Sequence, residues 1–499
     1  MTTGMIITAV LVLLVALLLF RVPVAIALGG SGAVGLLLLH SFDYTTNLLG
    51  SEPFGQTASF GLTIIPMFIL MGMFAVRAHV AEYVFRIADS VLGRFPGGLG
   101  VATVAASAGF SAVSGSSIGT AATMARLSVA EMRAAGYPAS LATALVAVAG
   151  TLGSMIPPST FLVLYAILAQ QSVGQMLAAG IVPGVLTAIA YSAYLVIAGQ
   201  RLKRKGVIRP PHLRHAVSEH VAAAKTAKTT TAGSAEEPAT VAAAAIATEE
   251  PPAGPESVEA VPPQGAASRK PTPLKELPWR GLFYIAALFC IVLGGMYSGY
   301  FTATESAAFG AIAAVLILLF ELRKTGLRGI SAGIAGALRD TASTTAMVFF
   351  IVIGSGILTA FFVAARVPQM ITDAVMSVNL PPMVVMALLL LALIPLGMML
   401  ESLSILVISV PLLLPIATEF GFDAIWLGIL IVKLIEIGMV TPPVGINAFV
   451  VAGTTGLPSE TVFRGIVPFF VVDLALIALF FFWPDLVLLL PSYVAEGAG

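Results

Sequence analysis

The chain has 499 residues, of which 58% are hydrophobic and only 10% are charged, with 25 basic and 25 acidic side chains. Soluble globular proteins carry about 25% charged residues, so this composition excludes an ordinary soluble domain and predicts an integral membrane protein. The formal net charge is zero, and no nucleic-acid partner is expected. A lone cysteine, Cys290, excludes an internal disulfide, and the five histidines show no metal-ligand spacing.

Long apolar runs follow one another along most of the chain. Each is long enough, or nearly so, to cross a hydrocarbon core about 30 Å thick as a helix. They cover residues 5–20, 23–40, 62–76, 176–198, 281–298, 303–320, 341–363 and 467–490. The expected fold is therefore all-α and embedded in the lipid bilayer.

The positions of the basic residues predict the topology. If the first apolar run crosses towards the cytoplasm, nearly all Lys and Arg residues lie on the cytoplasmic side, and Arg366 and Lys433 are the exceptions. Such an asymmetry is the positive-inside signal of helical membrane proteins. It places both termini outside, on the periplasmic side, and gives each half of the chain five crossings. Because that number is odd, the second half is inverted relative to the first.

One sequence pattern occurs twice, and all its matching residues are separated by the same distance along the chain. Gly153-Ser-Met-Ile-Pro-Pro158 returns as Gly438-Met-Val-Thr-Pro-Pro443, and Gly180-Ile-Val-Pro183 returns as Gly465-Ile-Val-Pro468. We call this constant shift, which takes Gly153 to Gly438, the repeat offset. Helix-breaking residues at matching points of two apolar halves are typical of secondary transporters with a binding site near the membrane midplane. The chain is therefore expected to consist of two inverted-topology repeats.

Residues 201–278 differ from the rest of the chain. The segment begins basic and then becomes rich in Ala, Thr, Pro and Glu, as in Glu249-Glu-Pro-Pro-Ala-Gly-Pro-Glu256. Because it has few large apolar residues to bury, a disordered cytoplasmic linker is expected, and a docking segment for another protein is the alternative. It separates a first repeat at 1–200 from a second at 279–491, and an external tail follows at 492–499.

Small and polar residues interrupt the apolar pattern at Ser107–Thr120. The arms on either side, 101–113 and 118–130, have about a dozen residues each and are too short to span a bilayer. The pattern predicts a re-entrant hairpin over 101–133 with its tip at Ser114–Ser117, where hydroxyls and free carbonyls are hard oxygen ligands for an alkali cation. A small-residue helix-packing face is the alternative, and it needs no ligand.

The repeat offset places Glu401 and Ser402 opposite that tip, within a second predicted hairpin over 383–418. Glu401 follows a long apolar run, where an ionised carboxylate is costly unless it is paired or faces water. It would bind a cation or hold the hairpin tip open to one. The structural alternative is a carboxylate that caps the second arm of the hairpin.

Two Pro-Pro pairs interrupt helices. Proline lacks a backbone donor and clashes with the carbonyl four residues back. Pro157-Pro158 therefore breaks a helix predicted over 139–169, and Pro442-Pro443 breaks one predicted over 424–455. The half-helix that begins at Ser159 presents free N–H groups and a positive dipole end to an anion. A kink without a ligand is the alternative and is common in membrane helices.

Other candidate residues are weaker. Thr302-Ala-Thr-Glu305 fits a helix cap, and Lys433 and Glu436, three positions apart on one helix, can neutralise each other. No phosphate-binding loop, pair of catalytic carboxylates or Ser/His/Asp arrangement is visible in the sequence. This argues against a nucleotide-driven pump and against an enzyme, and no cofactor is expected.

Four segments carry a family resemblance: Phe110–Ser117, Gly150–Ser159, Gly299–Glu305 and Gly438–Gly445. Together they resemble the large membrane subunit, the DctM-type permease, of the tripartite ATP-independent periplasmic (TRAP) transporters, over nearly the whole chain except the linker. Ala303 stands where the family usually has proline. The resemblance implies an elevator-type carrier similar to the ion transporter superfamily. Such a carrier imports a small organic acid anion, for example a C4-dicarboxylate or a sugar acid, with sodium as the coupling ion.

The resemblance also implies partners and site residues. The partners are an extracytoplasmic solute-binding receptor and a small DctQ-type membrane subunit, in the cell inner membrane. One sodium site would be lined by Ser114, Gly115, Ser116, Thr151 and Gly153, and a pseudo-symmetric one by Glu401, Ser402, Gly438, Thr441 and Gly445. The carboxylate substrate would lie near Ser114, Ser159 and Glu401. No metal other than sodium is implied.

Three alternatives stay open. A stand-alone sodium/dicarboxylate symporter of the divalent-anion type uses similar hairpins, and copurification of a small membrane partner would exclude it. A passive channel would need a continuous polar face along several helices, and an intramembrane enzyme would need a nucleophile–base pair within the spans. Saturable, ion-coupled transport separates a carrier from both.

Overall fold

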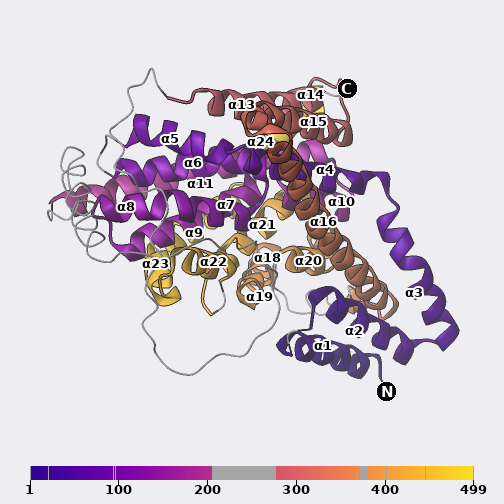
Figure 1. Cartoon of the computed structure of the whole chain (residues 1–499). Coiled ribbons are helices and arrows are strands. Elements are labelled where there is room, and N and C mark those ends of the chain that lie inside the picture. Colours follow the sequence, from indigo (N-terminus) through magenta and orange to yellow (C-terminus); the bar gives the residue numbers. More distant parts are fainter. Residues whose placement is uncertain are drawn as a thin grey trace, which may run out of the picture.

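The computed structural model describes residues 2–20, 22–93, 95, 97–204, 277–367, 369–370, 373, 380–399, 402–443 and 445–497. Within these ranges the chain is helical and has no strand, which confirms the all-α prediction (Figure 1). The first half contains α1 (Thr3–Leu19), α2 (Val24–Leu39), α3 (Phe42–Thr57), α4 (Ile64–Arg77), α5 (Val80–Leu92), α6 (Gly98–Ser114), α7 (Ser117–Met124), α8 (Ala130–Ala134), α9 (Ala139–Met155), α10 (Thr160–Leu168) and α11 (Val173–Arg204). The second half contains α13 (Arg280–Phe289), α14 (Gly295–Tyr297), α15 (Ala303–Leu322), α16 (Gly326–Ala364), α18 (Pro382–Leu391), α19 (Leu393–Met399), α20 (Ser402–Glu419), α21 (Ala424–Val440), α22 (Ile446–Thr455), α23 (Ser459–Phe482) and α24 (Pro484–Gly497).

Several helices are long and apolar enough to cross a membrane. Among the described residues, six helical segments qualify: Phe60–Arg77, Val173–Arg204, Arg280–Tyr297, Ala303–Ala364, Ser402–Glu419 and Ser459–Phe482. A seventh span results if α9 and α10, which meet at a bend of 43°, are counted as one broken helix. Shorter apolar helices, among them α1, α2, α6 and α22, have 10–17 residues. These lengths and compositions are those of a multi-pass membrane protein.

The 39-residue helix α16 holds much of the N-terminal part together. It packs along α2, α3 and α4, and α15 packs against α4 (Figure 1). A Cβ atom at Gly32 on α2 would lie 2.7 Å from the Cα of Leu358, and one at Gly354 on α16 would overlap the carbonyl oxygen of Ala25. Small residues at a crossing let two membrane helices approach this closely. We call α2, α3, α4, α15 and α16 the α16 group.

Helices α9 and α21 form the centre of a second group. Every residue from Ala142 to Met155 on α9 and from Ile425 to Val440 on α21 is buried. A helix that is buried on every face belongs in a core, because it has no face to offer to the surroundings. Around them pack α6, α7, α22 and α23 on α9, and α19, α20 and α23 on α21. Both halves of the chain therefore contribute to one core.

A cluster of polar residues anchors the start of the second half. Glu321 on α15 accepts hydrogen bonds from the hydroxyls of Tyr83 on α5 and Tyr284 on α13, each at 2.7 Å, and pairs with Arg280 at 3.3 Å. Burial and the hydrogen bond to Glu321 raise the pKa of Tyr83 to about 12, so this phenol remains a donor at neutral pH. These bonds fix α13 and α15 against α5.

Three boundaries differ from the sequence-based expectation. The first hairpin arm begins at Gly98 and forms a 17-residue helix, longer than the dozen residues expected. α11 continues to Arg204, past the expected linker start at 201, with three basic residues in its last turn, where they stabilise the helix dipole. α24 runs to Gly497, where an external tail was expected from 492. The rest of the predicted linker, up to residue 276, lies outside the described residues.

Candidate functional site

The first hairpin turns at Gly115. α6 ends at Ser114 and α7 begins at Ser117, and Gly115 has a φ of 58°, in the left-handed region that glycine adopts without steric cost. Ser116 caps α7, because its hydroxyl accepts a hydrogen bond from the N–H of Gly119 at 3.2 Å. The turn thus brings together the C-terminus of one helix, the N-terminus of the next and three serine hydroxyls.

The pair α9–α10 breaks at Pro157-Pro158. α9 ends before the two prolines, and α10 begins directly after Ser159. The hydroxyl of Ser159 accepts a hydrogen bond from the N–H of Leu162 at 3.4 Å and donates to the carbonyl of Ser154 at 2.5 Å. Ser159 therefore links the C-terminal end of one half-helix to the N-terminal end of the next.

The hairpin turn and this break lie against each other. The hydroxyl of Thr160 donates to the carbonyl of Gly115 at 3.0 Å, and the hydroxyl of Ser117 donates to that of Ser154 at 3.1 Å. A Cβ atom at Gly153 would lie 2.9 Å from the carbonyl oxygen of Ser116, so a glycine is needed for this approach. We call residues 114–117 and 153–160 the first junction.

The predicted residues of the first sodium site lie in or next to the first junction. Ser114, Gly115, Ser116 and Gly153 are part of it, and so is Ser159, which was predicted to lie near the substrate. Ser114 is 9% exposed and its hydroxyl lies 2.9 Å from that of Thr120. Thr151 is buried two positions before Gly153 on α9, and its hydroxyl donates to the carbonyl of Val148 at 2.8 Å.

The predicted residues of the second site are less closely gathered. Ser402 begins α20, and its hydroxyl contacts the sulfur of Met439 near the end of α21. A Cβ atom at Gly438 would lie 2.5 Å from the Cα of Gly397, which brings α19 onto α21. Thr441 follows α21, and its hydroxyl donates to the carbonyl of Ile437 at 2.5 Å. Gly445 precedes α22 with a φ of 49°, and Glu401 lies outside the described residues.

The contacts of the two halves follow the repeat offset seen in the sequence. Ser117 contacts Ser154 in the first half, and Ser402 contacts Met439 in the second. The two pairs are each 37 positions apart, and the repeat offset takes both members of the first pair to those of the second. Equivalent positions therefore make equivalent contacts, although a thioether replaces one hydroxyl.

A buried charged cluster adjoins the first junction. Lys433 on α21 is fully buried, and its ammonium lies 2.9 Å from Glu436 Oε2 and 2.9 Å from Asp473 Oδ1 on α23. The hydroxyl of Tyr191 on α11 lies 2.8 Å from both oxygens of Asp473. The other oxygen of Glu436 accepts a hydrogen bond from Ser154 at 2.7 Å. The cluster therefore joins three helices and ends at the first junction.

Part of this cluster was predictable. The expected ion pair between Lys433 and Glu436 is confirmed. Outside the cluster, the expected helix cap at Thr302 is also confirmed, since Thr302 forms a capping box with Glu305 at the start of α15. Asp473 and Tyr191 were missed. Asp473 is an acidic residue inside the apolar run 467–490, and an ionisable residue within a membrane span is itself a signal for a buried partner.

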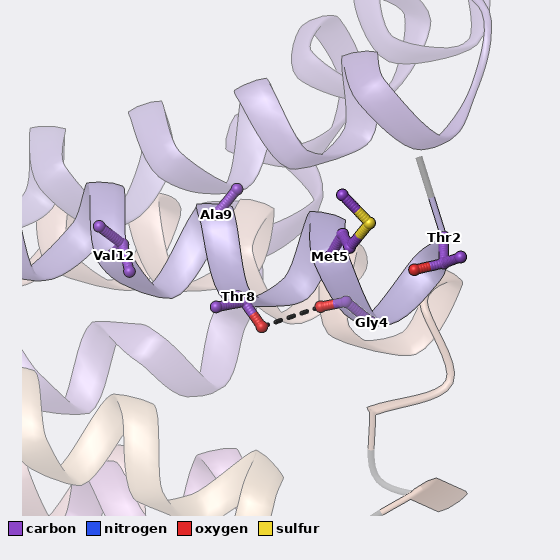
Figure 2. Close-up of a pocket in the computed structure, with 6 residues that line it drawn as sticks. All are labelled: Thr2, Gly4, Met5, Thr8, Ala9 and Val12. Carbon is purple, nitrogen blue, oxygen red and sulfur yellow. Dashed lines mark hydrogen bonds between the residues drawn. The ribbon is translucent and has the colours of Figure 1, made fainter.

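A hollow on the outer face of α1 is not part of this site. Figure 2 shows its lining side chains along one helix near the N-terminus, with the Thr8 hydroxyl donating to the Gly4 carbonyl at 2.9 Å. The lining residues, all exposed, are Thr2, Gly4, Met5, Thr8, Ala9 and Val12. In a membrane this face would meet lipid or another subunit.

Comparison with models of known protein families shows to which family the chain belongs. The family model described as "Tripartite ATP-independent periplasmic transporter, DctM component" matches residues 11–486, which is nearly the whole chain. The chain belongs to the DctM family of TRAP transporter large permeases. The resemblance inferred from the sequence is thereby confirmed, and this DctM-family chain is a multi-pass transporter subunit.

Two curated relatives extend the comparison of this DctM-family chain. The C4-dicarboxylate TRAP transporter large permease protein DctM of Pseudomonas aeruginosa is 30% identical over 468 residues, which are 94% of this chain and 94% of the relative. The sialic acid TRAP transporter large permease protein SiaM of Vibrio cholerae is 28% identical over 446 residues, 89% of this chain and 90% of the relative. Relatives of similar identity thus carry different substrates in their names.

A solved structure shares the fold of this DctM-family chain. The Alcanivorax borkumensis YdaH transporter, described as having an unusual topology, aligns with a TM-score of 0.57 over 95% of this chain and 98% of its own. Its sequence identity is 14%, so the likeness concerns the fold alone.

Proposed function

We propose that this chain is the large permease of a sodium-coupled, receptor-dependent symporter that imports a small organic acid anion. A C4-dicarboxylate or a sugar acid is the expected class of substrate. The observation that carries the proposal is the first junction, where two broken helices meet inside the apolar core. Non-helical backbone at membrane depth persists when it is buried in protein or lines a binding cavity.

The chemistry of the first junction suits a sodium ion. α6 and α9 both end there, and the last carbonyls of a helix have no partner within the helix and carry its negative dipole end. Discontinuous membrane helices coordinate Na⁺ in this way in known transporters. Ser114, Gly115, Ser116, Thr151 and Gly153 would provide the hydroxyl and carbonyl oxygens. None of these groups has a charge that would bind a multivalent metal in preference.

The anion would bind at the helix N-termini of the first junction, whose dipole ends are positive. α7 and α10 both begin at the first junction, at Ser117 and Thr160, and their free N–H groups and positive dipole ends favour a carboxylate. Ser159 caps α10 and lies beside these N–H groups. A sodium ion at the helix C-termini and a carboxylate at the helix N-termini would attract each other, which is a physical basis for symport.

A second sodium site would occupy the equivalent place in the second half. Its residues would be Glu401, Ser402, Gly438, Thr441 and Gly445. The equivalent contacts Ser117–Ser154 and Ser402–Met439 support this pairing of the halves. They also support two inverted repeats, the arrangement in which a transporter binds its ligands between related halves.

The helix packing supports an elevator-type movement. The α16 group would serve as the fixed scaffold, and the core around α9 and α21, which carries both sets of site residues, would move across the membrane. We infer an inner-membrane location with both termini periplasmic, as the basic residues predict. The inferred partners are an extracytoplasmic solute-binding receptor and a small DctQ-type membrane subunit.

The experiment that tests this proposal measures uptake in proteoliposomes. The full chain is reconstituted with its small membrane subunit, and uptake of radiolabelled carboxylate is followed at a fixed inward sodium gradient with and without liganded receptor. We expect almost no uptake until the receptor is added outside. Equal rates with and without receptor would instead favour a stand-alone symporter of the divalent-anion type, and non-saturating uptake would favour a channel.

A further inference from the structure

The charged cluster behind the first junction is fully enclosed by protein. The side chains of Lys433, Glu436 and Asp473 are 0%, 2% and 3% exposed. Taking charges out of water is costly, and only good geometry with additional hydrogen bonds offsets that cost. Here every carboxylate oxygen has a donor, from Lys433, Tyr191 or Ser154. Such a cluster has one defined arrangement, and it can hold its neighbours in place.

The hydroxyl of Ser154 has one proton and two acceptors. It lies 2.7 Å from Glu436 Oε1 and 2.7 Å from the carbonyl oxygen of Thr151. A hydrogen bond to an ionised carboxylate is roughly twice as strong as one to a neutral carbonyl. The proton of Ser154 therefore goes to Glu436 as long as Glu436 is charged, and the Thr151 carbonyl keeps a lone pair free.

The same hydroxyl positions the hairpin turn. Ser154 accepts the hydrogen bond of Ser117, the first residue of α7, at 3.1 Å. The backbone carbonyl of Ser154 accepts the hydrogen bond of Ser159, which caps α10. Ser154 thus connects the charged cluster with both broken helices of the first junction.

The described residues of the second half make no equivalent connection. By the repeat offset, Met439 is the counterpart of Ser154, and Val148, Thr151 and Ala188 are the counterparts of Lys433, Glu436 and Asp473. The contact of Ser402 with Met439 involves no charged group. A cluster that served only to pack the helices would not need a hydrogen bond to Ser154 at the first junction.

We propose that Glu436, held in its charged state by Lys433, is a positioning residue that sets the cation affinity of the first junction through Ser154. The ammonium of Lys433 stabilises the carboxylate, the carboxylate takes the proton of Ser154, and the Thr151 carbonyl is left free for the cation. This inference rests on the proposed function, because the cation is the coupling sodium ion. It predicts that the two sodium sites differ in their dependence on these residues.

Sodium binding to the purified full-length protein tests the proposal without transport. Thermal stability is measured at increasing NaCl, with choline chloride keeping the ionic strength constant, because a ligand that binds the folded state raises Tm with its concentration. Glu436→Gln keeps the size of the side chain and removes its charge, and Ser154→Ala removes the hydroxyl. Glu436→Gln is expected to raise the sodium concentration for half-maximal stabilisation about tenfold, because the Ser154 proton then bonds to the Thr151 carbonyl. Ser154→Ala removes that proton and leaves the carbonyl free, so its shift is expected to be smaller.

Ser31→Ala is the matched control. Ser31 on α2 is buried like Ser154, and its hydroxyl donates to the carbonyl of Leu28, three residues earlier, at 3.1 Å, with no carboxylate beside it in the described part of the chain. This variant is expected to keep the sodium response of the wild type. The double variant Glu436→Gln/Ser154→Ala is expected to respond to sodium like Ser154→Ala alone, because without the hydroxyl Glu436 has no proton to draw away from the Thr151 carbonyl.

Three outcomes would overturn the proposal. A lower Tm in Glu436→Gln with an unchanged sodium response would show that the cluster has only a structural role. A double variant that keeps the full shift of Glu436→Gln would show that Glu436 does not act through Ser154. The third outcome combines two results: sodium does not stabilise the wild-type protein, and uptake proceeds without sodium. Together they would overturn both this inference and the proposed function.

Discussion

The hydroxyl of Ser154 on α9 lies 2.7 Å from the carboxylate of Glu436 on α21, although the two residues are 282 positions apart in the chain. This bond joins the first half of the chain to the second inside the buried core. Asn447 on α22 makes a further connection, since its amide donates to the carbonyl of Ala147 on α9 at 3.4 Å. The candidate site of one half is thus supported by residues of the other.

A methyl group at Gly153 is expected to abolish uptake. In Gly153→Ala the new Cβ atom would lie 2.9 Å from the Ser116 carbonyl, so the hairpin turn must move away from α9. Uptake should fall at least about a hundredfold, since a displacement of about 1 Å has effects of this size on positioned groups. Initial uptake rates in proteoliposomes measure the effect.

Gly30→Ala is the control for this substitution. Gly30 also lies in an apolar helix, but a Cβ atom there would meet no atom within 4 Å. Because alanine is the better helix former, this variant should transport normally and be slightly more stable, by up to about 1 kcal/mol. Equal loss of uptake in both variants would contradict the role given to Gly153.

Removal of the Ser114 hydroxyl is expected to weaken sodium dependence. Ser114→Ala deletes one oxygen at the hairpin turn and its bond to Thr120. The sodium concentration for half-maximal uptake should rise about tenfold or more, because the cation loses either an oxygen ligand or the hydrogen bond that positions its ligands. Membrane insertion should be normal, since alanine keeps the segment apolar. Wild-type sodium dependence of uptake would leave Ser114 with a purely structural role.

The charged cluster should contribute strongly to stability. Lys433→Met leaves two buried carboxylates without their counter-ion, which is expected to cost about 3–5 kcal/mol. Arg77→Met removes a cation from the pair Arg77–Asp340, whose side chains are 38% and 46% exposed, and should cost at most about 1 kcal/mol. Thermal unfolding followed by fluorescence-detected size-exclusion chromatography compares the two variants. A similar fall in Tm for both would contradict the buried-cluster interpretation.

Deletion of residues 215–265 should leave uptake close to that of the wild type. The second half is anchored by Glu321, which binds Tyr83 of the first half as well as Tyr284 and Arg280. The remaining connection of about 20 residues spans on the order of 25 Å root-mean-square as a flexible chain. Uptake and copurification of the small membrane subunit are measured together. Loss of copurification would show that the deleted segment docks a partner.

Much of the fold was predictable because its signals are local. Apolar runs predict helices, Pro157-Pro158 predicts the break before α10, and the small polar run around Gly115 predicts the turn between α6 and α7. Helix ends were predicted less well, as α11 and α24 show, because capping and tertiary contacts decide the last turns.

The interior of the site was predictable only in part. The repeat offset relates positions along the chain, and the contacts of Ser117 and Ser402 follow it. The same offset says nothing about which residues of the two halves meet. Asp473 and Tyr191, 282 positions apart, come together only through the packing of α11, α21 and α23, and no local pattern in the sequence encodes such a pairing.

The central claim is that sodium drives the import of an organic acid anion through the first junction. Uptake of labelled carboxylate is measured in proteoliposomes that contain the full chain and its small membrane subunit, with liganded receptor outside. An inward gradient of Na⁺, of K⁺ or of protons alone is imposed at the same ionic strength. Uptake is expected with the Na⁺ gradient only, because the junction itself offers neutral hydroxyl and carbonyl oxygens, and the charged side chains behind it, Lys433, Glu436 and Asp473, are at most 3% exposed, so bulk water does not reach them to supply a proton. Full uptake with a proton gradient in the absence of sodium would contradict the account.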